Sequence, residues 1–324
     1  MEQIKEAIQE SYLLIKSIKN EISKQLVGQE KLVNSLLTGL LTGGHVLIEG
    51  VPGLAKTSAV KALAKTVQAD FKRIQFTPDL LPADLTGTEI YRPKTSDFIT
   101  RQGPLFNNII LADEINRAPS KVQSALLEAM EEKQVTIGDQ TFFLPNPFLV
   151  LATQNPIEQE GTYSLPEAQV DRFMLKVLID YPDKIQELEI LKKNSFEKPE
   201  DIKPVINCEQ IASIGALINQ IYVDEKLKEY IVDLVVSSRH PEKYGINTGQ
   251  YIEFGASPRA TIFLAKAARV NAFLSDRAYI TPQDIKIVGP DVLRHRVILS
   301  FEAEAEDIVS DDIIQTMFDS VEVP

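Results

Sequence analysis

Tryptophan is absent from this 324-residue sequence, and cysteine and histidine are scarce. Without tryptophan the chain has no indole fluorescence, and its one cysteine, Cys208, cannot form an intrachain disulfide. Because disulfides are rare in a reducing cytosol, this cysteine content is typical of a cytoplasmic protein, and we expect that location. The three histidines lie far apart, without the spacing of metal ligands, so no zinc site is expected; they are His45, His240 and His295.

Long apolar runs are missing as well. No stretch approaches the ~20 apolar residues that a membrane-spanning helix needs. The first twenty residues form a charged, amphipathic pattern and lack the apolar segment of a signal peptide. We therefore expect no insertion into a membrane.

Positive charge is in short supply. The chain has 34 lysines and arginines against 46 acidic residues, which gives a formal net charge of −12. Proteins that bind nucleic acids usually carry a basic surface, so no nucleic-acid partner is expected. Residues 301–324 contain eight of the acids and no lysine or arginine. This acidic tail is either a solvated, partly helical end or a segment that docks a partner.

The remaining composition is that of a folded protein, with 44% hydrophobic and 25% charged residues, and the length favours about two domains. Strands alternate with helices up to about residue 180, which predicts an α/β fold with a parallel sheet covered on both faces. Beyond Asp180-Tyr181-Pro182 the apolar spacing is mainly helical. We therefore place a boundary near residue 181, between an α/β domain of residues 1–181 and an all-α domain of residues 182–324. The predicted strands are residues 45–49, 73–76, 108–112, 148–153 and 175–179.

Three further features belong to the first predicted domain. Apolar residues at steps of three and four between Ile4 and Leu26 indicate an amphipathic N-terminal helix. Residues 77–106 are an insertion with short elements, and residues 134–147 form a hairpin, because two β-rich runs flank the turn Gly138-Asp139-Gln140.

A glycine-rich segment joins the first predicted strand to a helix of about residues 57–68. It reads Gly50-Val51-Pro52-Gly53-Leu54-Ala55-Lys56-Thr57, the pattern and context of a phosphate-binding loop. Backbone N–H groups and the dipole at the start of the helix favour an anion there. Lys56 can reach the β- and γ-phosphates, and the Thr57 hydroxyl can ligate Mg²⁺. The general pattern has glycine before the lysine, whereas this chain has Ala55.

Polar side chains follow two of the other predicted strands. Asp113 and Glu114 come directly after the strand at 108–112, which places two carboxylates at the carboxyl edge of the sheet. Asp113 would hold Mg²⁺ with its water shell, and Glu114 would orient and activate the attacking water. Asn155 follows the strand at 148–153, where it either bonds the γ-phosphate or the water, or caps a turn before Pro156.

Four segments together resemble the MoxR family of AAA+ ATPases, and the resemblance covers nearly the whole chain. The segments are GVPGLAKT, LADEINRAP, LATQNPIEQEGTYSLPEAQVDRF and GASPRA. The resemblance implies an AAA+ P-loop NTPase core with a central parallel sheet flanked by helices, followed by a C-terminal all-α lid domain. It also implies ATP and Mg²⁺ as cofactors, with ATP bound between core and lid. The implied nucleotide-binding residues are Val27, Gly28, Gly50, Val51, Pro52, Gly53, Leu54, Ala55, Lys56, Thr57, Ser58 and Asp113.

Roles for three catalytic residues beside Glu114 follow from the same resemblance. Asn155 matches the sensor 1 position, Arg172 the arginine finger that reaches a neighbouring subunit, and Arg259 the sensor 2 arginine of the lid. A permanently charged guanidinium suits a developing phosphoryl charge. The alternatives are a local salt bridge for Arg172 and a helix-start charge for Arg259. Arg117 is either a subunit-interface residue or a solvated surface residue.

The family resemblance implies an ATP-hydrolysing, chaperone-like remodeller of protein complexes. Its relatives form rings, often hexamers, and act on partners that often contain a von Willebrand factor A domain, which suggests maturation of metalloenzymes. The insertion and the hairpin are features of the AAA+ branch that includes magnesium chelatase subunits, and family members tolerate small residues at the Ala55 position. Exposed insertions are where a client would dock.

Two other functions are compatible with the residues. The chain could be a nucleotide-gated binding switch with negligible hydrolysis, although all hydrolytic positions carry suitable residues. A motor on DNA would need a basic channel, and the hairpin at 134–147 offers only the flanking Lys133 against Asp139.

Overall fold

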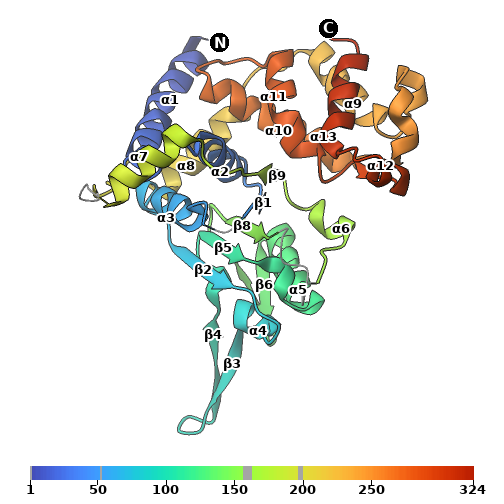
Figure 1. The fold of residues 1–324 in the computed structure, drawn as a ribbon. Helices are drawn as coiled ribbons and strands as arrows, with labels where there is room; N and C mark the ends of the chain where they lie inside the picture. The colour runs from blue at the N-terminus through green and yellow to red at the C-terminus, as the bar shows by residue number, and fades with distance from the viewer. Residues whose placement is uncertain (1, 52, 156–162, 196–199) are drawn as a thin grey trace. The chain divides into compact units, whose positions relative to one another are not determined.

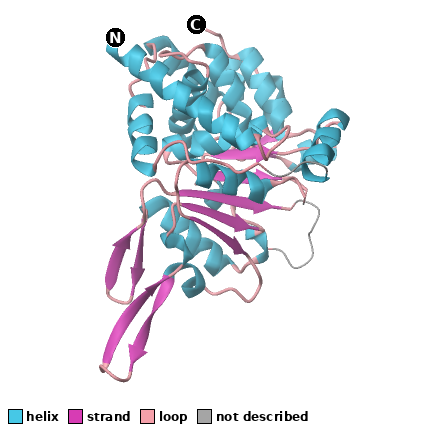
Figure 2. Cartoon of the chain, turned by 90° about the vertical axis from the view of Figure 1, so that its left-hand side faces the viewer, coloured by secondary structure: helices cyan, strands magenta, loops and turns pink. Residues whose placement is uncertain are grey.

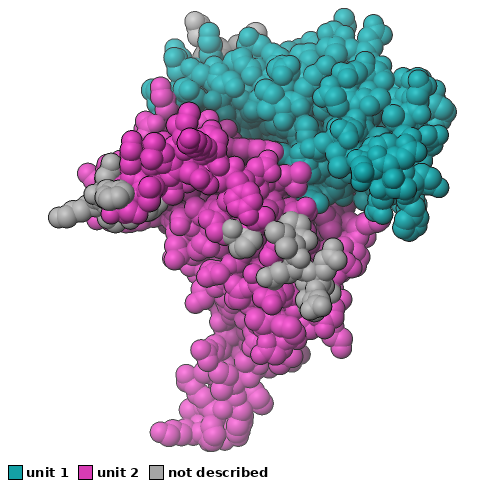
Figure 3. All heavy atoms as spheres, in the orientation of Figure 1, with its two compact units in different colours: residues 1–15, 174–176, 213–324 teal, residues 16–173, 177–212 magenta. Residues whose placement is uncertain are grey.

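The computed structural model describes residues 2–51, 53–155, 163–195 and 200–324. The chain divides into two compact units, shown in different colours in Figure 3. We call residues 16–173 and 177–212 the core unit, and residues 1–15, 174–176 and 213–324 the helical unit.

This division differs from the predicted boundary near residue 181, because residues 182–212 belong to the core unit. The segment after residue 200 packs against the C-terminal end of α3 (Lys56–Thr66). The backbone N–H groups of Val205 and Ile206 donate to the Thr66 carbonyl at 2.8 and 3.2 Å. The Lys203 N–H donates to Glu21 Oε2 at 2.9 Å. These bonds tie the segment to the core unit although its own periodicity is helical.

A five-stranded sheet carries the fold, in the order β2-β5-β8-β1-β9 (Figure 1). Strands β2, β5, β8 and β1 pair in parallel, as predicted. The apolar runs of β1, β5 and β8 are buried, because helices cover a parallel sheet on both faces, whereas the edge strand β2 is mostly exposed. Helix α5 packs on one face in a cluster with side chains from β5 and β8. Helix α2 contacts β1, and α3 contacts β2 and β5. The strands are β1 (Val46–Glu49), β2 (Phe71–Gln75), β5 (Ile109–Asp113), β8 (Leu149–Gln154) and β9 (Leu175–Leu178).

Two antiparallel hairpins leave the sheet of the core unit (Figure 2). The predicted insertion contains α4 (Pro82–Thr86) and the long hairpin of β3 (Gly87–Arg92) and β4 (Asp97–Gln102). Near its tip the rings of Tyr91 and Phe98 pack 5.2 Å apart, and both side chains are exposed. The second hairpin pairs β6 (Gln134–Ile137) with β7 (Gln140–Phe143), within the predicted range 134–147.

The helical unit is built mainly from helices, as predicted, with one exception. Strands β10 (Ile252–Phe254) and β11 (Ile298–Leu299) pair antiparallel, which corrects the prediction that this part is all-α. The two strands are only three and two residues long, so they leave little periodic signal in the sequence. The predicted helix start at Thr281 is confirmed, because its N–H donates to Asp284 Oδ2 at 2.7 Å in a capping box.

The remaining helices follow the amphipathic patterns of the sequence. Helix α1 buries Ile8, Ile15, Ile18 and Ile22 on one face, which confirms the predicted N-terminal helix. Within the described residues, no helix is both long and apolar enough to cross a membrane. The other helices are α1 (Glu2–Ser23), α2 (Glu30–Thr42), α3 (Lys56–Thr66), α5 (Ser120–Glu132), α6 (Glu167–Val170), α7 (Lys184–Ser195), α8 (Cys208–Ile218), α9 (Glu225–Ser237), α10 (Pro258–Leu274), α11 (Pro282–Leu293), α12 (Phe301–Ala305) and α13 (Ser310–Ser320).

Candidate functional site

The glycine-rich segment connects the end of β1 to the start of α3, the context that the sequence predicts for it. Gly50 lies close to Ile179, the residue that follows β9. A Cβ atom on Gly50 would be 2.7 Å from the Ile179 carbonyl oxygen. Gly53 instead has a positive φ of 88°, a conformation that glycine adopts readily. Each glycine therefore meets a different requirement of the loop. Pro52 lies outside the described residues.

Ala55, in place of the usual glycine, has a left-handed backbone with φ of 54° and precedes the first residue of α3. A left-handed backbone costs free energy for any non-glycine residue, because its Cβ atom crowds the following carbonyl oxygen. Alanine adds only this one carbon, so it is the smallest departure from glycine. The position therefore keeps the loop conformation in spite of the substitution.

Lys56 begins α3 and folds back over the loop, where its Nζ donates to the Gly50 carbonyl at 2.5 Å. Burial lowers the pKa of Lys56, and the neighbouring Asp113, Glu114 and Glu49 carboxylates partly oppose this shift. The ammonium group therefore lies between a carbonyl and acidic side chains, at the place where the sequence predicts phosphate groups.

A cavity of about 360 Å³ collects the predicted chemistry-bearing side chains. Lys56 and Thr57 line it from the loop side, and Asp113, Glu114 and Asn155 line it from the ends of β5 and β8. This arrangement agrees with the predicted convergence at the carboxyl edge of the sheet. Three lining residues were not predicted to belong to the site: Arg73, Thr153 and Gln154.

Asp113 is held by two of these unpredicted neighbours. Thr153 Oγ1 donates to Asp113 Oδ1 at 2.6 Å. Arg73 donates twice to Asp113 Oδ2, from Nε at 2.9 Å and from Nη2 at 2.6 Å. The Asp113 carboxylate is therefore oriented from β8 on one side and from β2 on the other.

Glu114 is held in an uncommon conformation, with a left-handed backbone and φ of 56°. Its N–H donates to Thr153 Oγ1 at 2.9 Å, and its Oε2 accepts from Gln75 Nε2 at 2.7 Å and from Arg117 Nη1 at 3.0 Å. Strained residues of this kind cluster at functional sites, where surrounding contacts keep them in place. Arg117, predicted as an interface or surface residue, thus contacts the carboxylate that is predicted to activate water.

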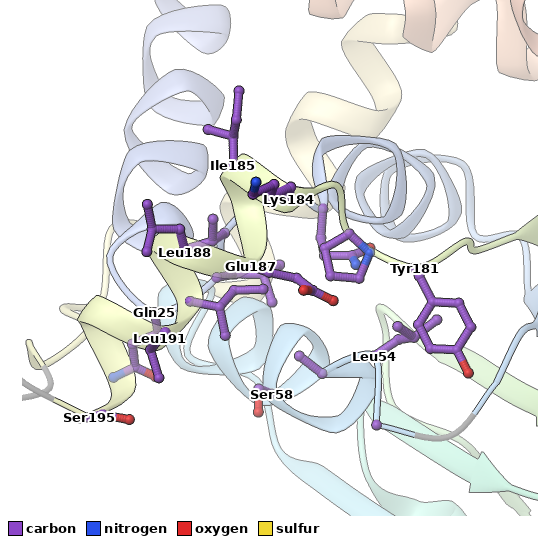
Figure 4. Close-up of a pocket in the computed structure, with 17 residues that line it drawn as sticks. Gln25, Leu54, Ser58, Tyr181, Lys184, Ile185, Glu187, Leu188, Leu191 and Ser195 are labelled. Carbon is purple, nitrogen blue, oxygen red and sulfur yellow. The ribbon is translucent and has the colours of Figure 1, made fainter.

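A larger cavity of about 980 Å³ adjoins the first at Gly53, Leu54 and Ala55 (Figure 4). Its lining is mostly apolar. Val27, predicted on the adenine side, lines it together with Ser58. Gly28 lines a neighbouring cavity; its φ is 69°, and a Cβ atom there would be 2.5 Å from Cδ of Gln186.

The wall opposite the loop comes from α7 and from Tyr181 and Pro182 before it. Apart from Tyr181, the sequence assigned these residues to the second domain. Tyr181, Ile185 and Leu188 contribute side chains to this wall (Figure 4). Their exposed fractions of 68%, 78% and 52% are high for large apolar groups. Exposed apolar side chains that line a cavity are typical of a ligand site.

Two predicted catalytic arginines lie outside these cavities. Arg172 Nε pairs with Glu131 Oε2 at 3.0 Å, which is the local salt bridge that the sequence left as an alternative. Arg259 belongs to the helical unit, where its N–H donates to the N-cap Ser257 Oγ at 3.2 Å at the start of α10. Their roles at the phosphates stay predictions.

Metal binding by protein side chains alone has no support in the described part of the chain. No group of three or more histidine, cysteine, aspartate or glutamate side chains is placed there to hold an ion. The two predicted magnesium ligands, Thr57 and Asp113, both line the smaller cavity.

Comparison with known proteins gives consistent matches to both units. A family model described as "ATPase family associated with various cellular activities (AAA)" matches residues 45–175, and one described as "AAA lid domain" matches residues 246–317. The crystal structure of a protein from Cytophaga hutchinsonii superposes with a TM-score of 0.92 at 50% sequence identity, covering 100% of this chain and 98% of that one.

Curated relatives point to the same family. The chain is 47% identical to "Chaperone MoxR1" of Mycobacterium tuberculosis over 305 residues, which are 94% of this chain and 81% of the relative. It is 46% identical to "Uncharacterized protein YeaC" of Bacillus subtilis over 96% of this chain and 95% of the relative. It is 30% identical to "Protein MoxR" of Methylorubrum extorquens over 94% of this chain and 93% of the relative. With the phosphate loop, the paired carboxylates and the lid match in one sequence, this chain belongs to the MoxR family of AAA+ ATPases.

Proposed function

We propose that this protein binds ATP with Mg²⁺ and hydrolyses it, with the phosphates in the smaller cavity and the base in the larger one. The observation that carries this proposal is the convergence of Lys56, Thr57, Asp113, Glu114 and Asn155 on one cavity that adjoins an apolar one. A polar pocket beside an apolar pocket matches the two halves of a nucleotide.

The donor set suits a magnesium nucleotide. Thr57 and Asp113 offer the oxygen ligands that Mg²⁺ prefers, and Lys56 supplies positive charge without competing as a ligand. When bound, the ion would neutralise charge on the phosphate oxygens. Glu114 would accept a hydrogen bond from the attacking water, and Asn155 would orient the γ-phosphate or that water.

The active form is proposed to be a ring, with a hexamer as the expected size. Arg172 would act on the nucleotide of a neighbouring subunit, since it does not line the cavities of its own chain. Its ion pair with Glu131 would keep the guanidinium oriented until a neighbour arrives. A trans arginine is worth about 10³–10⁵ in rate in other nucleotide hydrolases.

The proposed clients are proteins in the cytoplasm. One relative is named a chaperone, which supports a remodelling role on protein complexes. A partner with a von Willebrand factor A domain, and through it the maturation of a metalloenzyme, is the finer proposal. The hairpin of β3 and β4 would contact the client, because Tyr91 and Phe98 expose apolar rings near its tip.

A nucleotide-gated switch with negligible hydrolysis is the second candidate. It is favoured by the two donors on Glu114 Oε2, since Gln75 and Arg117 occupy the accepting sites of an oxygen that would otherwise contact the attacking water. In this case ATP would select partners without being consumed at an appreciable rate.

The ATPase rate per subunit, measured against protein concentration, tests both candidates. The wild type is compared with Glu114→Gln and Arg172→Ala, with Lys72→Ala as a control on an exposed cation of β2. A specific rate that rises with concentration and is lost in both variants supports the ring motor. ATP binding with flat, negligible turnover in every protein supports the switch. A full rate at high dilution that Arg172→Ala leaves unchanged contradicts the trans arginine.

A further inference from the structure

Arg73 lines the smaller cavity, although the sequence did not predict it there. It projects from β2, the edge strand of the sheet, whose residues Arg73 and Gln75 lie on the same face because strand side chains alternate. The pairing register sets Gln75 opposite Asp113, so both β2 side chains reach the end of β5. The Arg73 guanidinium is thereby placed beside the predicted magnesium ligand.

The Arg73 contacts leave Asp113 Oδ2 without spare accepting capacity. A carboxylate oxygen has about two lone-pair sites. Arg73 Nε and Nη2 both donate to Oδ2, at 2.9 and 2.6 Å, and Thr153 uses one site on Oδ1. A hydrated cation that approaches Oδ2 must therefore displace at least one Arg73 hydrogen bond.

The remaining site on Oδ1 does not remove this conflict. A divalent cation there would share one carboxylate with a guanidinium, and the two positive charges would repel each other even in a polar environment. Asp113 is only 19% exposed, so bulk water screens this repulsion incompletely. The structure therefore places two cations in competition for one acidic group.

Arg73 is free to leave without unfolding the site. Its side chain is 49% exposed, and its Nη2 also donates to the Gln75 Oε1 atom at 3.0 Å. A half-exposed guanidinium can be solvated when its carboxylate is taken, whereas a buried one could not. The free-energy cost of removing Arg73 from Asp113 is therefore small, and the exchange is reversible.

From these contacts we propose that Arg73 competes with Mg²⁺ for Asp113 and so sets the magnesium concentration at which the protein binds ATP. The inference rests on the proposed function and adds a regulatory property to the same site. The guanidinium holds Asp113 in the nucleotide-free protein and is exchanged for the ion when the magnesium nucleotide binds. Nucleotide binding without Mg²⁺ leaves Arg73 on Asp113.

Magnesium titrations of nucleotide binding test this competition. A fluorescent, non-hydrolysable ATP analogue is held at a subsaturating concentration with the full-length chain, and its anisotropy is followed as Mg²⁺ is added. We expect Arg73→Met to lower the midpoint about two- to fivefold, the size that a partly exposed ion pair supports. Arg73→Lys, which restores one cation without the two-pronged contact, returns the midpoint toward that of the wild type. Lys72→Ala, on the same strand but outside the cavity lining, leaves it unchanged.

The outcomes separate this inference from the proposed function. Binding by all proteins with the same midpoint for wild type and Arg73→Met overturns the competition alone. Weaker binding of Arg73→Met both in EDTA and in saturating Mg²⁺ also overturns it, because Arg73 would then be a phosphate ligand. Failure of the wild type to bind the analogue at any Mg²⁺ concentration overturns the proposed function, and the inference with it. Thermal unfolding of each variant, expected within a few degrees of the wild type, excludes a folding defect.

Discussion

Thr153 Oγ1 donates a hydrogen bond of 2.6 Å to Asp113 Oδ1, and the same oxygen accepts the Glu114 N–H at 2.9 Å. A single buried hydroxyl on β8 therefore orients both acidic residues at the end of β5. It fixes the Asp113 carboxylate directly, and it supports the left-handed backbone of Glu114 through the peptide N–H.

Replacing Thr153 by valine is expected to separate nucleotide binding from hydrolysis. Thr153→Val keeps the side-chain shape but removes the acceptor for the Glu114 N–H, which costs about 1–2 kcal/mol of unfolding free energy. Because Glu114 loses its support, we expect the ATPase rate to fall by roughly tenfold or more. Affinity for ATP, measured by calorimetry, should change by less than about threefold, since Thr153 is not a predicted phosphate ligand.

Thr153→Ser is the matched control, because serine keeps the hydroxyl and loses only a methyl group. It should retain most of the wild-type rate. Equal loss of rate in the valine and serine variants would show that packing of the methyl group, rather than the hydroxyl, positions the acids.

His45 predicts a pH dependence of stability. The ring is buried between two backbone groups, with Nδ1 accepting from the Val150 N–H at 3.0 Å and Nε2 3.1 Å from the Met130 carbonyl. Burial lowers the pKa of His45 to about 4, with a smaller contribution from Lys133 in the same direction and opposition from the Met130 bond. Since the unfolded chain binds the proton more tightly, His45 stabilises the fold above pH 6.5, and this contribution is lost as pH falls toward 4.

Denaturant unfolding at pH 7 and pH 5 measures this effect. The wild type should lose about 2 kcal/mol of unfolding free energy through His45 over this range. His45→Gln should be less stable at pH 7 but should show a shallower pH dependence by that amount. His240→Gln, at an exposed histidine of the helical unit, should keep the wild-type dependence. An unchanged slope in His45→Gln would contradict the assignment.

Ala55 predicts tolerance to glycine and intolerance to branched side chains. Ala55→Gly relieves the left-handed backbone but gives the unfolded chain more freedom, so the two effects should cancel to within about 0.5 kcal/mol. Ala55→Val places a branched side chain at a positive φ, which is a strong outlier. We expect the valine variant to lose more than about 1 kcal/mol of unfolding free energy and to bind ATP weakly, both measurable by thermal unfolding with and without nucleotide. A glycine variant as weak as the valine variant would disprove this explanation.

Leu188 tests the larger cavity. Leu188→Glu should weaken ATP binding by roughly tenfold or more, because a charged group replaces an apolar contact to the base. Leu188→Met, of similar volume, should stay within about threefold of the wild type. Ile287→Glu introduces the same charge at an exposed apolar residue of the helical unit. If it weakened binding as much as Leu188→Glu does, net charge rather than the cavity would be responsible.

The sequence was sufficient for the parts of the site that lie on short contiguous motifs. The loop from Gly50 to Thr57 and the pair Asp113-Glu114 each follow a buried strand, and the physics of a parallel sheet then brings them together. The hairpin around Gly138 was also predictable, because the turn residues stand between two β-rich runs.

The partners of the carboxylates could not be predicted in the same way. Arg73 and Gln75 are 40 and 39 residues from Asp113 and Glu114, and as exposed residues of an edge strand they carry no signal of their own. Their proximity depends on the strand order, which places β2 beside β5. A pattern of alternating strands and helices indicates a parallel sheet without giving that order.

The wall of the larger cavity was missed for a related reason. Ile185 and Leu188 of α7 are three residues apart, a spacing that also occurs on a helix that faces a core. A cavity-facing stripe and a core-facing stripe look alike until the tertiary structure shows which one is covered. The turn at Asp180-Tyr181-Pro182 also suggested a boundary near residue 181. The hydrogen bonds of Val205 and Ile206 to Thr66 hold the following segment in the core unit instead.

The tight approach of Gly50 to the Ile179 carbonyl changes how substitutions in the loop must be interpreted. A Gly50→Ala protein would first meet backbone crowding at 2.7 Å, before any nucleotide enters. Loss of activity there would measure whether the β1 end still fits against the chain after β9, not how strongly the loop holds a phosphate. Gly53 has a φ of 88°, and among the described residues no atom lies within 4 Å of a Cβ built there, so in the nucleotide-free protein its substitution would report on backbone conformation.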